Sequence, residues 1–202
     1  MNICIIDTGS ANLNSVAQAV KRCGYSACVT SDLEVLSKAD RLILPGVGTA
    51  GSVMEGIYSH NLLDFILNTT KPLLGICLGM QILAESSTEV PLESNTDSIE
   101  TLGIVKGQVH HLKASGLRLP HMGWNQVEHT DHPLFEGIKD KAFFYFDHSF
   151  ALDLGDYAIG KTEYGESFTS ALASGNFMGV QFHPEKSSQA GQRLLTNFIN
   201  NF

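Results

Sequence analysis

The stretch PLLGICLGMQI, residues 72–82, decides the fold of this 202-residue chain. An apolar run typical of a buried strand ends at Cys77, which has Gly75 and Gly79 on either side. Leu78, Ile82 and Leu83 follow at helical spacing, so the stretch predicts a strand, a sharp turn and a helix. The pattern has the form of the Gly-x-Ser-x-Gly nucleophile elbow with cysteine at its centre.

Cys77 is a candidate nucleophile because of where this turn would place it. A side chain at the start of a helix faces free backbone N–H groups and the positive end of the helix dipole, which favour the thiolate. The thiolate is the nucleophilic form of cysteine. The alternative is a small buried apolar residue at a strand end, and the pentapeptide alone does not exclude it.

Composition limits the classes of protein to consider. With 43% hydrophobic and 17% charged residues, the chain is globular and long enough for one domain with a sizeable core. A net charge of −8 without a basic run argues against nucleic-acid and anionic-membrane surfaces. The apolar runs are too short to cross a bilayer, and the N-terminus lacks the basic region of a signal peptide.

The cysteines point to a reducing compartment. Cys4, Cys23, Cys28 and Cys77 form no Cys-x-x-Cys pair, and Cys4 and Cys28 lie in apolar strand-like runs. We therefore expect reduced thiols, a cytoplasmic location, and neither a disulfide nor a metal site.

Strand-like and helix-like segments alternate in the first half of the chain. Such alternation predicts a mostly parallel sheet with helices on both faces, and ligands outside the C-terminal ends of its strands. The predicted strands are 2–6, 25–30, 41–44 and 73–76, and the predicted helices begin near 13, 32, 49 and 62.

The second half changes character. Residues 86–100 are polar and predict a loop or flap, and short strands then follow one another without helices, which indicates antiparallel additions. One helical turn is predicted at 132–135 and a final helix from 187 or 188. We find no repeat or linker, so we expect one α/β domain over residues 1–202. The predicted strands of this half are 103–112, 125–129, 142–150, 157–164, 168–173 and 176–182.

His183 is the histidine best placed to serve Cys77. It ends an apolar run, and Pro184 biases it to an extended conformation, in which residues two apart point to the same side. Glu185 can then lie beside the imidazole, hold its tautomer and stabilise its charged form. Taken alone, His-Pro-Glu is equally a polar turn, but with the cysteine elbow it predicts a Cys-His-Glu triad.

Acyl transfer also needs an oxyanion hole. One donor would be the backbone N–H of Leu78, just after the nucleophile. The second is expected at Val47 and Gly48 in the loop PGVG, residues 45–48, which follows a predicted strand. The alternative is an ordinary glycine-rich turn. A phosphate-binding loop is excluded because no Lys-Ser/Thr pair follows.

These motifs resemble the class I, triad-type glutamine amidotransferases. GICLGMQ (75–81) and GVQFHPE (179–185) carry that resemblance. Further stretches are similar to those of the glutaminase subunits of imidazole glycerol phosphate synthases, and the similarity runs end to end. They are IIDTGSANL (5–13), LPGVG (44–48), PHMGWN (120–125), FYFDHSF (144–150) and KSS (186–188). The resemblance implies a flavodoxin-like fold and no cofactor.

The resemblance also implies a reaction and a partner. Cys77 would attack the amide of L-glutamine to form a glutamyl thioester, His183 would protonate the departing ammonia and activate water, and Glu185 would orient His183. Ammonia would pass to a separate (β/α)₈-barrel cyclase that makes imidazole glycerol phosphate in histidine biosynthesis. The oxyanion loop would become competent only with the partner and its ligand bound.

Other site residues rest on the same resemblance. It places glutamine against Gly79, Gln81, Glu89, His148 and Ser149. For Glu89 the alternative is a solvated loop charge.

Partner contacts are implied at Trp124, Asn125 and Lys186, although Trp124 could equally be a core residue. Asp147 stands where the resemblance leads us to expect an apolar residue. Its carboxylate would change the charge beside the glutamine pocket or at the interface.

Two other functions remain open at this point. A related amidotransferase subunit could feed ammonia to a different acceptor, for example a sugar in surface-polysaccharide assembly, and the triad does not separate the two. A non-enzymatic scaffold that keeps the fold is the third hypothesis. Because one glutaminase domain accounts for the sequence, we expect a second protein to use the ammonia.

Overall fold

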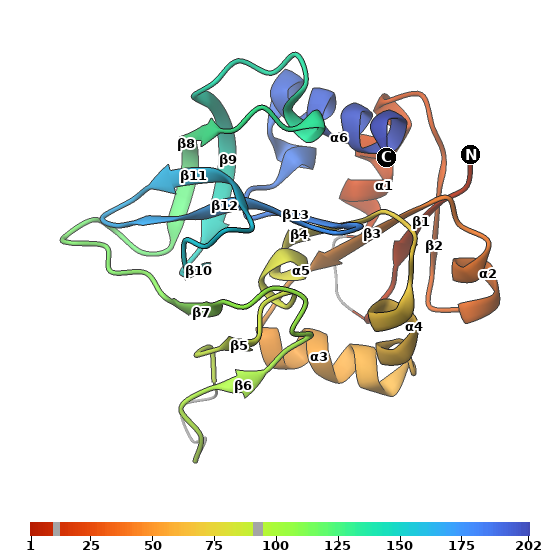
Figure 1. Cartoon of the computed structure of the whole chain (residues 1–202), viewed down its shortest axis with the longest axis horizontal. Helices are drawn as coiled ribbons and strands as arrows, with labels where there is room; N and C mark the ends of the chain where they lie inside the picture. The colour runs from red at the N-terminus through yellow and green to blue at the C-terminus, as the bar shows by residue number, and fades with distance from the viewer. Residues whose placement is uncertain (10–12, 91–94) are drawn as a thin grey trace.

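One mixed sheet organises the described residues, 1–9, 13–90 and 95–202, of the computed structural model (Figure 1). Its path runs β2-β1-β3-β4-β13-β12-β10-β7-β5-β6, and β11, β8 and β9 branch from it. The strands from β2 to β13 are parallel, and β12 is antiparallel to β13. The predicted α/β fold, with a parallel first half and antiparallel additions, is confirmed.

The first half alternates strands and helices as predicted. Its strands form the parallel part of the sheet, and its helices pack on both faces (Figure 1). The elements are β1 (Ile3–Ile6), α1 (Leu13–Arg22), β2 (Ala27–Thr30), α2 (Leu33–Ser37), β3 (Arg41–Gly46), α3 (Ala50–Ser59), α4 (Leu63–Asn68), β4 (Leu73–Cys77) and α5 (Leu78–Gln81).

The second half is dominated by strands. Two single-turn 3-10 helices interrupt them, at Pro133–Phe135 and Pro184–Lys186. The elements are β5 (Ser86–Ser87), β6 (Ile99–Glu100), β7 (Gln108–His111), β8 (His121–His129), β9 (Ala142–His148), β10 (Phe150–Leu152), β11 (Ala158–Glu163), β12 (Ser167–Ser174), β13 (Phe177–Val180) and α6 (Ser188–Asn201).

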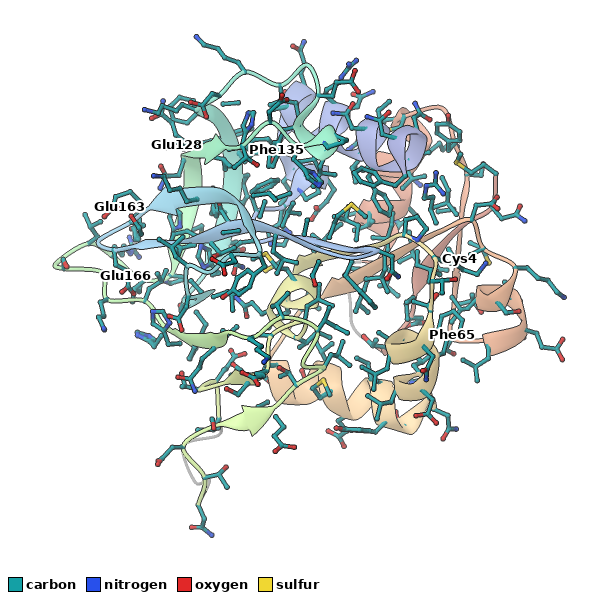
Figure 2. All side chains as sticks on the ribbon, in the orientation of Figure 1. Cys4, Phe65, Glu128, Phe135, Glu163 and Glu166 are labelled. Atoms are coloured by element: carbon teal, nitrogen blue, oxygen red, sulfur yellow. The ribbon has the colours of Figure 1, made fainter. Side chains whose placement is uncertain are left out.

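Two apolar layers explain why the early strands are continuously hydrophobic. Side chains alternate between the faces of a strand, and both faces here are covered. Ile3 and Ile5 pack under α1 and α6, whereas Cys4 and Ile6 pack with α2, α3 and α4 (Figure 1). Phe135 belongs to the first layer, whose side chains fill the space below α6 (Figure 2). The core thus lies on both sides of β1, β3 and β4.

The helix predicted after Cys77 is much shorter than expected. α5 ends at Gln81 because backbone N–H groups of residues 102–105 donate hydrogen bonds to the carbonyls of residues 82–84. Leu102 N–H donates to Ile82 O, Ile104 N–H to Leu83 O and Gly103 N–H to Ala84 O, at 2.7–2.9 Å. These contacts satisfy the carbonyls across the chain, so no further helical turn is needed to satisfy them.

Three strand predictions need correction. The strand predicted at 103–112 is confined to β7, since residues 102–105 bind the turn after α5. The strand predicted from 125 begins at His121, where β8 pairs with His148 of β9. The strand predicted at 142–150 is broken at Ser149, because β9 pairs with β8 whereas β10 turns to pair with β7 and β12.

The polar segment predicted at 86–100 contains only the paired two-residue strands β5 and β6, and its residues 91–94 lie outside the described part of the chain. The segment 5–13 likewise includes residues 10–12, which are not described. Within the part of the chain that the structure covers, no helix is long and apolar enough to cross a membrane.

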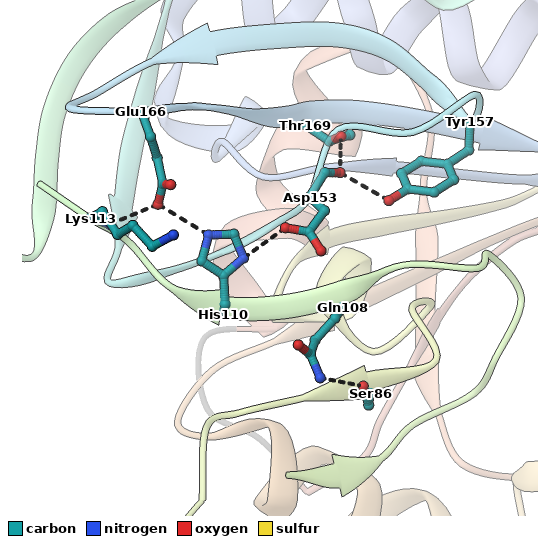
Figure 3. Close-up of polar contacts among 8 residues, drawn as sticks. All are labelled: Ser86, Gln108, His110, Lys113, Asp153, Tyr157, Glu166 and Thr169. Carbon is teal, nitrogen blue, oxygen red and sulfur yellow. Dashed lines mark hydrogen bonds and ion pairs between the residues drawn. The ribbon is translucent and has the colours of Figure 1, made fainter. Parts of the chain in front are cut away.

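His110 on β7 contacts two carboxylates from other parts of the antiparallel sheet (Figure 3). Its Nδ1 lies 3.0 Å from Asp153 Oδ1 and its Nε2 lies 3.1 Å from Glu166 Oε1. Burial alone would raise the pKa of Glu166, but the Lys113 N–H and His110 together hold it below its usual value. Asp153 follows β10 and Glu166 precedes β12, so one imidazole joins three strands.

The elbow at Cys77 is packed backbone against backbone. Cys77 has φ 55° and ψ −112°, a positive φ that non-glycine residues rarely adopt. A Cβ on Gly79 would lie 1.7 Å from Leu44 O of β3, and one on Gly75 would lie 2.5 Å from Gly79 O. Only glycine therefore fits at these two positions.

Replacing His110 with alanine should lower the free energy of unfolding by about 1 kcal/mol, because its two partly exposed contacts with carboxylates are lost. Urea denaturation near neutral pH measures this. Glu128→Gln is the control, since Glu128 is an exposed residue in surface pairs with Lys161 and Lys141, and a change within about 0.5 kcal/mol is expected. Equal effects of the two substitutions would contradict the role given to His110.

Gly79→Ala should destabilise the protein by about 3 kcal/mol or more, because the new methyl group meets a backbone carbonyl that has no room to move. Gly51→Ala is the matched control: Gly51 lies in α3, and the nearest atoms to its Cβ would be 3.9 Å away. That change should be neutral or stabilising by up to about 1 kcal/mol. Thermal and urea unfolding compare the two, and similar stabilities would show that the elbow is not tightly packed.

Candidate active site

The predicted triad residues lie together at the C-terminal edge of the parallel strands. Cys77 ends β4 and His183 follows β13, and these strands are neighbours with Ile76 in register with Val180. Cys77 and His183 line one pocket of about 370 Å³. His183 Nδ1 is 2.8 Å from Glu185 Oε1. The predicted extended conformation holds for His183 alone, because Pro184–Lys186 form a 3-10 turn that brings the carboxylate back to the ring.

Charge is concentrated on the His183 imidazole. Burial alone would lower its pKa, but the contacts with Cys77 and then with Glu185 outweigh burial and raise it to about 10. Nδ1 is taken by Glu185, which leaves Nε2 as the nitrogen available to the sulfur. The ring is therefore an imidazolium at neutral pH, able to pair with a thiolate and to give up a proton.

The Cys77 sulfur has two further neighbours. Gln181 Nε2 lies 3.7 Å from Sγ, and the Asp147 carbonyl oxygen lies 4.0 Å from it. Sequence reasoning missed Gln181. The available signal was a lone amide in the apolar run 177–182, two residues before the histidine, since a buried polar side chain needs a specific partner.

The loop predicted for oxyanion binding borders the same pocket. Val47, Gly48 and Leu78 all line it, and β3 runs as far as Gly46 beside Cys77. Gly48 has φ +93°, a conformation open to glycine. The backbone following β3 and the turn following Cys77 thus approach one another across the pocket.

Four of the residues expected to bind glutamine line this pocket: Gln81, Glu89, His148 and Ser149. Gly79 instead packs against the Leu44 carbonyl. Glu89 is half-buried and its Oε2 accepts from the Ala50 N–H at 2.7 Å. Burial raises the pKa of Glu89 more than this hydrogen bond lowers it. The carboxylate is therefore not a freely solvated loop charge.

Of the residues expected at a partner interface, Lys186 lines the pocket, whereas Trp124 and Asn125 lie on β8. Trp124 is 53% exposed, so its alternative assignment to the core is wrong. Its ring meets the Tyr145 ring edge-on, with 6.1 Å between ring centres, and Lys186 Nζ lies 5.5 Å from the centre of the Tyr145 ring. Asn125 is half-buried, and its side chain bonds His121 and Glu163 O.

The ribbon of β8 and β9 carries an exposed apolar patch, which we define as Met122, Trp124, Phe143 and Tyr145. The exposed fraction is 61% for Met122 and 53% for both Trp124 and Phe143. The patch reaches the pocket because Asp147 pairs with Met122 and also lines the pocket. Asp147 therefore lies both beside the pocket and at the border of the patch.

Comparison with known proteins shows which family the chain resembles. The sequence pattern described as "Glutamine amidotransferase class-I" matches residues 4–202. The chain is 49% identical to "Imidazole glycerol phosphate synthase subunit HisH" of Vibrio cholerae, covering 98% of each chain. It is 47% identical to the protein of the same name from Salmonella typhimurium, covering 98% of this chain and 99% of that one.

Solved structures share the fold. A crystal structure described simply as a glutamine amidotransferase gives a TM-score of 0.73 at 19% identity, covering 98% of this chain and 96% of that one. A glutamine amidotransferase from Thermotoga maritima gives a TM-score of 0.64 at 19% identity, covering 96% and 80%. The match along residues 4–202, with close relatives over almost the whole length, means that the chain belongs to the class I glutamine amidotransferase family.

Proposed function

We propose that this protein is the glutaminase subunit of imidazole glycerol phosphate synthase in histidine biosynthesis. It hydrolyses L-glutamine to glutamate and ammonia in the cytoplasm and delivers the ammonia to a (β/α)₈-barrel cyclase subunit. The observation that carries the proposal is the Cys77, His183 and Glu185 arrangement in one pocket. The relatives named as the synthase subunit, at 49% and 47% identity, favour this partner over an enzyme that aminates a sugar.

The triad performs the hydrolysis in two halves. The Cys77 thiolate attacks the side-chain carbonyl of glutamine, and a C–S bond forms as the carbonyl oxygen becomes an oxyanion. The intermediate collapses, the C–N bond breaks, and the His183 imidazolium gives its proton to the departing ammonia. Neutral His183 then takes a proton from water, the hydroxide attacks the thioester, and the thiolate leaves with glutamate released. Glu185 holds the imidazole in place throughout.

The oxyanion is bound by backbone N–H groups. The Leu78 N–H lies just beyond the nucleophile, and the loop at Val47 and Gly48 supplies the second donor. What supports this assignment is that the three residues border the pocket with Cys77. Partner binding brings the loop into its competent conformation, which limits wasted hydrolysis.

Glutamine is held at both of its ends. Glu89 pairs with the α-ammonium, and Gln81 and the backbone at Gly79, His148 and Ser149 position the rest of the molecule. Support comes from the shared pocket, whose volume suits a small amino acid. Gly79 contributes through its backbone only.

The cyclase docks on the exposed apolar patch, with Trp124 as an anchor and Asn125 and Lys186 at its border. A large exposed aromatic residue beside an active-site opening is the kind of feature that marks a protein interface. Docking there covers the pocket opening, so ammonia leaves toward the partner rather than into solvent.

Cys77→Ala should abolish glutamine-dependent synthesis by at least about 10³-fold yet leave synthesis from added ammonia, since only the ammonia source is lost. Product formation by the complex with the cyclase measures both. Cys23→Ala is the control because Cys23 lies away from the pocket, with Sγ 3.6 Å from Gln192 O. Loss of both activities in Cys77→Ala would contradict the proposal. So would failure of the gene for the unaltered protein to rescue a histidine auxotroph.

Trp124→Ala should weaken binding of the cyclase by at least about tenfold, because a buried anchor is removed from the interface. Titration calorimetry with the purified cyclase measures the dissociation constant. Tyr58→Ala is the matched control: Tyr58 is 56% exposed on α3, away from the patch. If both variants bind like the unaltered protein, the patch is not the docking surface.

A further inference from the structure

We propose that His121 and Gln181 are positioning residues in the two arms of one hydrogen-bond chain, which meet at the Phe150 carbonyl and in which each proton position is fixed. The chain begins at Asn125, beside the patch, and ends at the Cys77 sulfur. It holds two pocket-lining side chains, His148 and Gln81, in single orientations. The inference rests on the proposed glutaminase function, which it deepens.

The outer end of the chain is set by the Asn125 amide. Its Oδ1 accepts from the Gln126 N–H at 2.7 Å, and its Nδ2 donates to the Glu163 carbonyl at 3.0 Å. The amide cannot be turned over without losing both bonds. Its Nδ2 also lies 3.2 Å from His121 Nε2, so Nε2 must accept and His121 carries its proton on Nδ1.

The two histidines pass this order inward. His121 Nδ1 lies 2.9 Å from His148 Nε2, and His148 Nδ1 lies 2.8 Å from the Phe150 carbonyl oxygen. A carbonyl only accepts, so His148 must carry its proton on Nδ1 and accept at Nε2. The tautomers required from the two ends of the chain therefore agree.

Burial keeps both rings neutral, as this order requires. It lowers the pKa of His121 to about 4 and that of His148 to about 3. His121 is also held flat between Phe146, at 4.7 Å, and Tyr164, at 3.9 Å between ring centres. Neither ring gains a proton near neutral pH, and the His121 ring has little freedom to turn.

The inner end of the hydrogen-bond chain fixes the orientation of the Gln181 amide, next to the Cys77 sulfur. The Phe150 carbonyl also accepts from Gln81 Nε2 at 2.8 Å, and that nitrogen uses its second hydrogen on Gln181 Oε1 at 2.9 Å. Gln181 is thereby oriented with its Nε2 toward Cys77 Sγ, 3.7 Å away. A turned-over amide would present an oxygen to the sulfur and repel a thiolate.

Each positioning residue acts through another group. His121 donates to Nε2 of His148 and so holds the orientation of that pocket-lining ring, which affects how glutamine is held. Gln181 presents an N–H to Cys77 and so favours the thiolate. The first should act mainly on the KM for glutamine and the second mainly on the reactivity of the sulfur.

Nitrogen-15 NMR of the histidine rings in the full-length protein tests the order directly. At pH 7 the unaltered protein should show His121 and His148 as neutral rings protonated on Nδ1. In His121→Phe, which keeps the stacking, the Phe150 carbonyl still requires the proton of His148 on Nδ1, but the Nε2 signal of His148 should shift because its hydrogen-bond donor is lost. A charged His148, or one protonated on Nε2 in the unaltered protein, overturns the proposal without any variant having to fold.

Kinetics provide a second readout in the complex with the cyclase. His121→Phe should raise the KM for glutamine about tenfold and change kcat less, since a buried donor to His148 is lost. His111→Phe is the matched control because His111 is an exposed neighbour on β7 that meets Phe150 edge-on at 5.1 Å. An unchanged KM in His121→Phe, or an equal rise in His111→Phe, contradicts the role of His121.

Thiol alkylation tests the inner end. Gln181→Glu keeps the shape but places carboxylate oxygens under the sulfur, so Cys77 should react with neutral iodoacetamide at least about tenfold more slowly at pH 7. Gln192→Glu is the control because Gln192 is an exposed amide on α6, and its Cys77 should react at the same rate as in the unaltered protein. An unchanged rate in Gln181→Glu removes Gln181 from the chain. If the unaltered complex shows the expected tautomers of His121 and His148 but has no glutaminase activity, the proposed function is wrong and the hydrogen-bond proposal is still supported.

Discussion

The rest of the site depends on the contact between the turn at Cys77 and the backbone of β3. Gly79 allows main chain to meet main chain there, since a Cβ at position 79 would fall 1.7 Å from the Leu44 oxygen, and Gly75 allows the turn to fold back on β4. This contact forces Cys77 to a positive φ and points its side chain out of the sheet edge into the pocket. It also holds Leu78 against Gly46, the residue before Val47, so the nucleophile and the proposed oxyanion donors are positioned by one packing constraint. The strain at Cys77 is tolerated because the surrounding strands over-determine the turn.

Electrostatics follow from the same burial. Cys77 and His183 are each less than a tenth exposed, so a charge on either is costly unless the other compensates it. Glu185 adds a second partner for the imidazole at 2.8 Å, and together the contacts overcome the burial that would otherwise keep His183 neutral. The neighbouring histidines have no acidic partner in the hydrogen-bond chain, and burial keeps them neutral. The pocket therefore holds one imidazolium next to the sulfur and one neutral ring, His148, a division that suits one proton donor.

Sequence reasoning reached the parts of this architecture that depend on local pattern. The parallel strands follow from continuous apolar runs, and the approach of His183 to Cys77 follows from two strands that end at one edge of the sheet. It failed where contacts between distant segments override local preference. Leu83 has helical spacing, yet its carbonyl is taken by residues 104 and 105. It also missed Gln181 and His121, because the partners that give them a role, Cys77 and His148, lie 104 and 27 positions away in the sequence.

The ribbon of β8 and β9 ties these parts together. Side chains alternate along it, so one face carries Met122 and Trp124 to the outside while the other carries His121 and His148 inward. Asn125 faces inward with the histidines yet follows Trp124 directly in the chain, and a shift of the ribbon at the patch must move both. His148 and Gln81 both donate to the Phe150 carbonyl, so a movement of His148 that displaces this carbonyl also changes the position of Gln81. The pairing of an exposed and a buried face on one ribbon is thus what places the interior of the site within reach of a surface event.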